Sequence, residues 1–359
     1  MTMHRDTLNR TDPLQDMESS ADDDALFLRY LNLGFLSPVI VFGVLGNFLG
    51  ILTWSRGCYR NTSTAALLIA LAIADTAVLT IPALERWLHR VIFFMIRNDN
   101  IVTCKIWAFL SYFGPTISSW IIVIVTAERF VSIWFPLKVF FVCTRKKAIF
   151  VVLGICLLMA ALYLPIMINA TLIKKENIGN QFYVNSTDIT SYSIICDAPE
   201  NEPFRNVYVP LLMWLDMGFL FIVPFLLIVI GNILILYKLY KSNTILTEEG
   251  HAISDRSKVT NSFTIQAITA SATFFVCLFP VTCYQVAGTI TEYRLPDYAD
   301  DIIHILLYAK SAFNFIIYCA IGSVFRKSLK TVLGNILSRK ERLMDHSDSS
   351  MNQTQESPL

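Results

Sequence analysis

The sequence predicts an all-α membrane protein, a bundle of seven transmembrane helices followed by a short amphipathic eighth helix. Hydrophobic residues make up 54% of the chain and charged residues 16%, whereas soluble domains typically have about 45–50% and about 25%. Windows of about twenty nearly uncharged residues recur, and each is long enough to cross a bilayer core about 30 Å thick. We expect each window to be helical, because a helix satisfies its own backbone polar groups in hydrocarbon.

The seven windows cover most of the chain and leave only short connections and two tails. They fall roughly at 33–54, 64–84, 106–127, 148–168, 208–236, 263–290 and 302–322. No soluble domain fits between them, so we expect four parts along the chain. These are an extracellular N-terminal tail (1–32), the bundle (33–322), an amphipathic juxtamembrane helix (323–340) and a disordered cytoplasmic tail (341–359).

Lysine and arginine predict the orientation of the bundle. With the N-terminus outside, the inner loops and the membrane-proximal tail hold 17 of these residues, and the outer segments hold 11. Because the excess belongs on the cytoplasmic side, we expect a multi-pass plasma-membrane protein with an extracellular N-terminus. Residues 1–30 contain no apolar stretch resembling a signal peptide, so the first span is expected to act as an uncleaved signal. The outer segments carry a net charge of −7, which favours a cationic partner.

The cysteines and the glycosylation sequons fit this topology. Of eight cysteines, only Cys104, at the top of the third span, and Cys196, in the second outer loop, lie on the oxidising side. We therefore expect a disulfide between them. Sequons at Asn9 and Asn185 are extracellular on this topology and are predicted glycosylation sites.

Seven short motifs occur in order along the predicted spans. They are Gly46-Asn47, Leu71-Ala-Ile-Ala-Asp75, Glu128-Arg129-Phe130, Pro136-Leu137, Pro224, Cys277-Leu278-Phe279-Pro280 and Asn314-Phe315-Ile316-Ile317-Tyr318. Together they resemble the rhodopsin-like (class A) family of G-protein-coupled receptors, over roughly residues 31–340. The stretches "TAERFVSIWFPLK" (126–138) and "SAFNFIIYCAIGSVFRKSL" (311–329) also resemble invertebrate FMRFamide-type neuropeptide receptors.

The chain departs from the pattern of the family at three places. Leu278 stands where the family usually has a tryptophan, and Phe315 replaces its proline in the seventh helix. The usual tryptophan of the fourth helix is missing around Ile155 and Cys156. These departures concern the way the bundle switches and leave the fold class unchanged.

The resemblance implies a receptor and not an enzyme, with no cofactor. Such a bundle has two states, biased by a ligand from outside and by a heterotrimeric G protein from inside. Arg129 is expected to pair with Glu128 in the closed state and to turn toward the G protein when the inner half of the sixth helix swings outward about Pro280. Asn232 could equally make an ordinary helix–helix hydrogen bond. The residues expected to carry the switch are Glu128, Arg129, Asn232, Leu278, Pro280, Asn314 and Tyr318.

A carboxylate lies near the middle of the second span. In the family, the residue at Asp75 holds a sodium ion with polar partners on the third and seventh helices, and Ser118 and Asn314 match two of these partners. Lys310, one turn above Asn314, is unusual there, and two unpaired charges at that depth would be very unfavourable. We therefore expect an ion pair between Asp75 and Lys310, with the ammonium group in place of sodium. The predicted buried polar network is Asn47, Asp75, Ser118 and Lys310.

The ligand site is expected to open outward between the third, fifth, sixth and seventh helices. An amine receptor needs an aspartate about four turns above Arg129, and Ser111 stands there instead. Asp216 lies inside an apolar span, which favours a functional role over a hydrogen bond within the bundle, and with Glu85 it suits an arginine-bearing, amidated peptide. The candidate ligand-binding residues are Glu85, Ser111, Tyr112, Trp214, Asp216, Tyr284, Gln285, His304 and Tyr308.

The segment after the seventh span predicts contacts with the inner leaflet. Apolar residues at Phe325, Leu329 and Val332 recur at helical spacing, and Arg326 and Lys327 lie on the other face. Serine and threonine residues among acids in the tail suggest a receptor kinase and arrestin as partners, or an inert tail. Nucleic acid is not an expected partner.

Three other functions are open to a seven-helix protein. A receptor for a lipid or another small molecule fits the apolar walls of the expected pocket. A transporter would show internal repeats, and the sequence shows none. A retinal-binding light sensor would need Lys310, which the resemblance places one turn deeper than the lysine of opsins.

Overall fold

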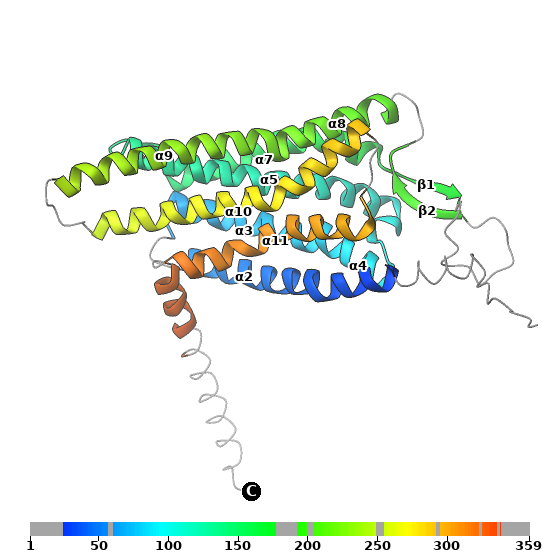
Figure 1. Ribbon diagram of the computed structural model, residues 1–359, viewed down its shortest axis with the longest axis horizontal. Helices are drawn as coiled ribbons and strands as arrows, with labels where there is room; N and C mark the ends of the chain where they lie inside the picture. Colours follow the sequence, from blue (N-terminus) through cyan, green and yellow to red (C-terminus); the bar gives the residue numbers. More distant parts are fainter. Residues whose placement is uncertain are drawn as a thin grey trace, which may run out of the picture.

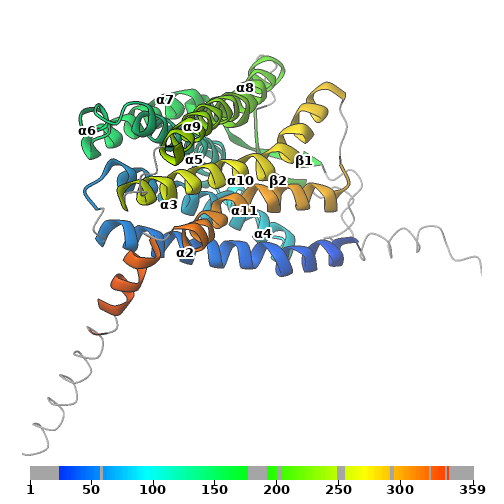
Figure 2. The same ribbon diagram turned by 60° about the vertical axis from the view of Figure 1, so that its left-hand side comes forward.

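The computed structural model describes residues 24–56, 60–176, 192–199, 204–248, 255–291, 295–322, 325–335 and 338. Seven helices in this part of the chain are long and apolar enough to cross a membrane, and they run side by side (Figures 1 and 2). They are Asp24–Arg56, Ser63–Ile92, Ile101–Trp134, Arg145–Asn169, Asn206–Lys241, Ile268–Gly288 and Asp297–Ile321. Each coincides with one predicted window, which confirms the seven-helix bundle. The predicted glycosylation sites at Asn9 and Asn185 and the predicted tail from residue 341 lie outside the described residues.

Figure 1 labels the parts of these helices. They are α2 (Ser37–Arg56), α3 (Ser63–Val78), α4 (Leu84–Ile92), α5 (Ile101–Trp134), α7 (Arg145–Asn169), α8 (Val209–Asp216), α9 (Val223–Glu248), α10 (Asp255–Thr291) and α11 (Asp297–Ile321). Wider π-helical turns lie within the first, second and fifth helices, at η1 (Asn32–Leu36), η2 (Leu79–Ala83), η4 (Phe204–Tyr208) and η5 (Met217–Ile222). A short helix, α6 (Val139–Val142), follows α5.

Two helices continue past the predicted windows, through charged residues. The second runs to Ile92, beyond Glu85, and the third runs to Trp134, beyond Glu128 and Arg129. Each of these charges has a partner of opposite sign inside the protein, so it does not have to reach water at a helix end. The first helix likewise begins at Asp24, so its first turns lie in the segment predicted as a tail.

The helix α5 lies at the centre of the bundle and packs against α3, α7, α9 and α10. The main hydrophobic core forms around it, from Ile117 and Ile121 of α5, Leu71 of α3, and Phe274 and Leu278 of α10. Leu278, which stands at the position of the tryptophan usual in the family, is therefore a buried core residue.

The first helix approaches the seventh closely because two of its core-facing residues are glycines. A Cβ atom on Gly43 would lie 2.9 Å from Cβ of Ala312, and one on Gly46 would lie 2.8 Å from Cβ of Phe315. Both distances are shorter than real contacts of Cβ atoms, so a side chain at either glycine would push α2 and α11 apart. This close packing brings the amide of Asn47 to the carbonyl oxygen of Ser311, at 3.2 Å.

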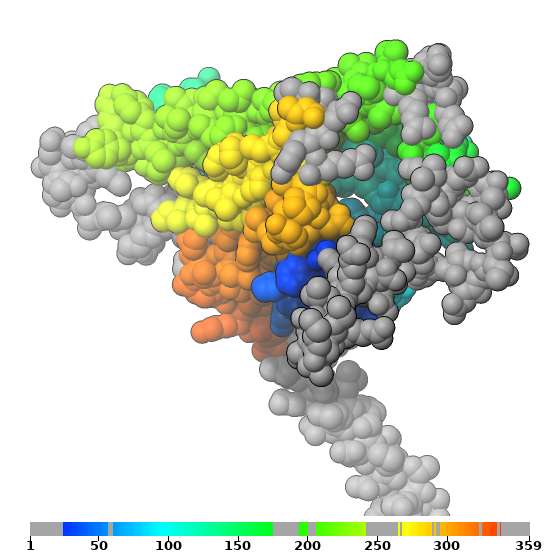
Figure 3. Space-filling model, turned by 45° about the vertical axis from the view of Figure 1, so that its right-hand side comes forward, coloured from blue at the N-terminus to red at the C-terminus, as the bar shows by residue number. Residues whose placement is uncertain are grey.

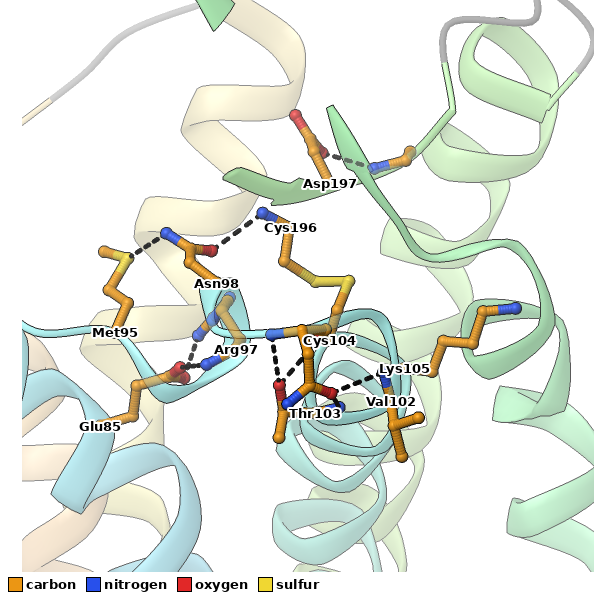
Figure 4. Close-up of a disulfide and its surroundings, with 12 residues drawn as sticks. Glu85, Met95, Arg97, Asn98, Val102, Thr103, Cys104, Lys105, Cys196 and Asp197 are labelled. Carbon is orange, nitrogen blue, oxygen red and sulfur yellow. Dashed lines mark hydrogen bonds and ion pairs between the residues drawn. A yellow bond between two sulfur atoms is a disulfide. The ribbon is translucent and has the colours of Figure 1, made fainter. Parts of the chain in front are cut away.

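The connection between the fourth and fifth helices, the second outer loop of the predicted topology, contains an antiparallel hairpin of β1 (Thr171–Glu176) and β2 (Tyr192–Asp197). The end of the bundle at which this hairpin lies is called the outer end, following that prediction. A disulfide joins Cys196 of β2 to Cys104 near the start of α5, which confirms the predicted bond. The main-chain N–H of Cys196 also donates to Oδ1 of Asn98, at 2.9 Å. The hairpin is thus fixed to the outer end of the bundle (Figure 4).

Residues 325–335 are helical, where the amphipathic eighth helix is predicted. Phe325 is fully buried and packs on Trp54 and Tyr318, with ring centroids 5.3 and 5.6 Å away. Arg326 and Lys327 are exposed. The helix therefore has one apolar face on the bundle and one basic face.

Candidate functional site

Two adjoining cavities lie at the outer end of the bundle, of about 310 and 240 Å³. They share three residues, Tyr112, Asp216 and Gln285. Figure 3 turns this end toward the viewer, with the first helix in blue, the fifth in green and the seventh in orange. All nine predicted ligand-binding residues line one or both cavities, namely Glu85, Ser111, Tyr112, Trp214, Asp216, Tyr284, Gln285, His304 and Tyr308.

Asp216 is a buried carboxylate on the wall common to both cavities. Its side chain accepts a hydrogen bond from the hydroxyl of Tyr163 at 2.7 Å, and Thr116 lies 2.9 Å behind that hydroxyl. Among the described residues Asp216 makes no ion pair. The hydrogen bond within the bundle, which the sequence left as an alternative, is thus present, but it supplies no positive charge.

Glu85 differs from Asp216 because its charge is already compensated. It forms an ion pair with Arg97, whose main-chain N–H also donates to it at 3.2 Å. Burial lowers the pKa of Arg97, but the hydrogen bond and the charge of Glu85 outweigh burial and raise that pKa overall, so Arg97 stays cationic. A cationic ligand group therefore finds free negative charge at Asp216 and not at Glu85.

An outer ionic cluster, which the sequence analysis missed, joins the first, second and seventh helices. It consists of Asn32, Arg86, Arg90, Asp297, Asp300, Asp301 and His304. Asp301 is fully buried, and both arginines reach it, at 3.1 and 3.4 Å. The sequence signal was the pair of arginines four residues apart on one helix face, matched by two adjacent aspartates at the start of α11.

His304 belongs to this cluster as well as to the cavity wall. Its Nδ1 lies 2.8 Å from Nη2 of Arg86 and 2.8 Å from the carbonyl oxygen of Asp300. The ring is therefore held in place by Arg86 of the second helix and by the main chain of α11. His304 shapes the cavity, and one of its two ring nitrogens is already engaged.

Three of the four residues of the predicted buried polar network, Asp75, Ser118 and Lys310, contact one another, whereas Asn47 donates to the main chain of Ser311. Ser118 donates to Oδ1 of Asp75 and Asn314 donates to Oδ2, each at 2.6 Å, on a carboxylate with no exposed surface. The ammonium group of Lys310 donates to the hydroxyl of Ser118 at 2.6 Å and lies 3.7 Å from Oδ1 of Asp75. The network therefore joins the second, third and seventh helices through one buried ion pair.

These residues do not fit a sodium ion. The oxygens of Asp75 and Ser118 that would coordinate it already face the ammonium group of Lys310. Two positive charges a few ångströms apart repel strongly where water is scarce. The part of the family resemblance that implies sodium at this place therefore does not extend to this chain.

The inner end of α5 holds a second buried pair. Arg129 pairs with Glu128, and the hydroxyl of Thr64, at the start of α3, contacts both. Thr64 was not predicted, because a threonine at the first turn of a helix is usually explained by capping. The expected closed arrangement of Glu128 and Arg129 is thus the one that the structure shows.

The other expected switch residues lie on three other helices, α9, α10 and α11. Pro280 lies inside α10. Tyr318 packs edge-on against Trp54, at 6.2 Å between ring centroids. Oδ1 of Asn232 is buried, and no donor among the described residues reaches it. Neither Tyr318 nor any other residue that the structure describes therefore donates a hydrogen bond to that oxygen of Asn232.

The sequence matches the model of the 7 transmembrane receptor (rhodopsin family) over residues 46–318. The chain therefore belongs to this family, as predicted. The thyrotropin-releasing hormone receptor of Mus musculus is 24% identical over 341 residues, or 85% of this chain and 80% of that receptor. The growth hormone secretagogue receptor type 1 of Homo sapiens is 23% identical (89% and 87%), and the cysteinyl leukotriene receptor 2 of Mus musculus 21% (83% and 89%).

Family membership defines the class of protein. The chain is a receptor and not an enzyme, and it is a multi-pass protein of the plasma membrane. It acts through a ligand and a G protein. The seven helices, the disulfide of the second outer loop and the outward-facing cavities agree with this class.

Proposed function

We propose that this receptor binds an extracellular, amidated peptide with a basic group and that it then activates heterotrimeric G proteins. One observation carries the proposal, the buried carboxylate of Asp216 facing both cavities with no cation beside it among the described residues. A buried charge is strongly unfavourable until it is paired, so a guanidinium or ammonium group of the ligand gains from the contact. The names of two relatives, receptors for thyrotropin-releasing hormone and for growth hormone secretagogues, support a peptide-like ligand.

The transmitted motion is an outward swing of the inner half of α10. The proline at 280 removes a backbone hydrogen bond from the helix and permits a bend there. Ligand contact with Tyr284 and Gln285, one turn above, biases that bend. At the inner end, Arg129 leaves Glu128 and Thr64 and turns toward the G protein. This sequence of events requires the N-terminus to be outside, as the distribution of lysine and arginine predicts.

A lipid or another small molecule is the second candidate ligand. The smaller cavity favours it, because Met213, Trp214 and Met217 give it a mostly apolar wall. The relative named cysteinyl leukotriene receptor 2 is similar over most of this chain. An anionic lipid would, however, have to lie beside the uncompensated carboxylate of Asp216.

Other expected properties of the chain are part of the same proposal. They are a specific likeness to FMRFamide-type neuropeptide receptors, glycans at Asn9 and Asn185, and contacts of the eighth helix with anionic inner-leaflet lipids. A receptor kinase and arrestin are proposed as partners of the tail.

The experiment is a calcium and cAMP screen of cells that express the full chain, against amidated peptides and a lipid-mediator panel. The proposal expects agonists with a basic side chain, and at least tenfold weaker activation of Asp216→Asn at equal surface expression. Activation by lipids alone, with Asp216→Asn responding like the parent, would favour the second candidate.

A further inference from the structure

One wall of the larger cavity is basic. The second helix and the turn η3 (Ile96–Asn98) bring Arg86, His89 and Arg97 to this wall, together with one acid, Glu85. Arg86 is neutralised by the aspartates of the outer ionic cluster, which do not line the cavity. Apart from the imidazole of His89, the charged groups left on this wall are therefore Arg97 and Glu85.

Of this pair, Arg97 and not Glu85 is the residue whose side chain is exposed to the cavity. The side chain of Arg97 is 37% exposed, whereas that of Glu85 is 3% exposed. The guanidinium group thus covers the carboxylate. A ligand in the cavity finds a cation on this wall, although the sequence predicted an anion there.

The position of Arg97 is fixed from several sides (Figure 4). Glu85 accepts from both its side chain and its main-chain N–H. The next residue, Asn98, accepts from the main chain of Cys196, which is disulfide-bonded to Cys104. The guanidinium group is therefore oriented before a ligand arrives, which reduces the entropy lost on binding.

Arg97 keeps hydrogen-bond donors that Glu85 does not use. A guanidinium group has five N–H donors in a planar fork. One nitrogen, Nη2, serves Glu85, and Nε is buried and has no acceptor among the described residues, so the donors of Nη1 are the ones left for a ligand. Planar acceptors such as a carboxamide carbonyl or a carboxylate match the geometry of the fork.

We propose that Arg97 binds a hydrogen-bond acceptor of the ligand, so that the site has two opposite poles. Asp216 takes the basic group, the apolar side cavity at Trp214 takes an aromatic or aliphatic group, and Arg97 takes a terminal carboxamide or carboxylate. Glu85 is a positioning residue that holds Arg97. This inference rests on the proposed function, because it assumes that a basic ligand group lies at Asp216.

The test uses small probes with one group for each part of the site. Desamino-arginyl-phenylalaninamide carries a guanidinium, an aromatic ring and a terminal carboxamide. Its phenethylamide analogue lacks the carboxamide, its free acid has a carboxylate there, and its desamino-citrulline analogue lacks the cation. Binding is measured by calorimetry on the purified full-length receptor in nanodiscs, without G protein.

Three variants are compared with the parent. The double variant Glu85→Gln/Arg97→Gln removes both charges of the pair without leaving either one alone in a buried place. Asp216→Asn reports on the basic group separately. Lys105→Gln is the matched control, because it removes an outer positive charge that does not line either cavity.

Loss of the carboxamide is expected to weaken binding to the parent and to Lys105→Gln about tenfold, or about 1.4 kcal/mol. In the double variant, loss of the carboxamide should weaken binding of the probe less than twofold. Tighter binding of the free acid would assign the natural acceptor to a carboxylate, and weaker binding would assign it to an amide. The inference is overturned if the carboxamide has no effect in the parent, if its full effect persists in the double variant, or if the parent binds no probe at millimolar concentration. If probe binding is weakened by Asp216→Asn and by the citrulline replacement but is unchanged in the double variant Glu85→Gln/Arg97→Gln, Arg97 is not a second pole of the site. The proposed function would then remain intact.

Discussion

Asp75 and Asp216 are both buried carboxylates of the membrane-spanning helices, and their surroundings differ. Asp75, at the midplane, receives hydrogen bonds from Ser118 and Asn314 and pairs with Lys310. Asp216, near the outer end, receives one hydrogen bond from a tyrosine and faces two cavities. The charge of Asp75 is compensated within the chain, whereas the charge of Asp216 is left for a partner from outside. The same residue type therefore holds helices together in one region and, on the proposed function, binds the ligand in the other.

The largest effect is expected at the midplane pair. Asp75→Asn and Lys310→Met each leave one buried charge without its partner, which should destabilise the fold by about 3–5 kcal/mol. The double replacement Asp75→Asn/Lys310→Met should recover part of that loss, because neither charge remains. Thermal unfolding of the purified receptor and its surface expression measure the three variants. If the loss of stability in the double variant equals the sum of the losses in the two single variants, Asp75 and Lys310 do not interact.

The next effect concerns the frame of the outer site. Replacing Cys196 by serine should reduce stability by about 2–5 kcal/mol and release the hairpin from α5. The turn that carries Arg97 would lose a tether at the same time, so ligand response should fall further than surface expression does. Cys283→Ser, at an exposed free cysteine of α10, is the control and should behave like the parent. Normal expression and response of Cys196→Ser would refute a structural role for the disulfide.

A smaller effect is expected at Asp216. Asp216→Asn keeps a side-chain oxygen for Tyr163 and removes the charge, so it should weaken a guanidinium-bearing agonist by about 1.5–3 kcal/mol, as for a charge-assisted hydrogen bond. A neutral analogue of that agonist should change much less. Dose–response curves for the two analogues measure the difference. Equal losses would mean that Asp216 supports the fold only.

The smallest expected effect is the response to sodium. Because Lys310 already lies beside Asp75, exchanging sodium chloride for choline chloride at constant ionic strength should leave agonist affinity and the unfolding temperature unchanged. Radioligand competition and thermal unfolding in the two salts measure this. A strong decrease of agonist affinity in sodium would contradict the placement of the Lys310 ammonium group.

The features that sequence predicted well are those fixed by the membrane. Apolar windows must be helical in hydrocarbon, and two charges at the same depth must pair, which was enough to predict the contact of Asp75 with Lys310. The cavity residues were predicted because the order of motifs placed each helix. No specific side-chain geometry was needed for either result.

The features that sequence did not predict depend on irregular backbone and on pairing over long distances. Arg97 lies in a turn whose path no periodicity defines, so Glu85 was assigned to the ligand and not to Arg97. The ion pairs of Arg86 and Arg90 with the seventh helix also extend α4 beyond its apolar window. Both arginines were visible in the sequence, but the aspartates with which they pair are more than 200 residues away along the chain.

The most direct test of the central claim compares the two carboxylates in one experiment. Thermal unfolding of the parent, Asp216→Asn and Asp75→Asn is measured with and without desamino-arginyl-phenylalaninamide. Asp216→Asn should unfold near the temperature of the parent and lose the stabilisation by the probe. Asp75→Asn should unfold at a lower temperature and keep that stabilisation. The account is contradicted if the probe stabilises Asp216→Asn as much as the parent, or if the loss of probe binding follows Asp75 instead.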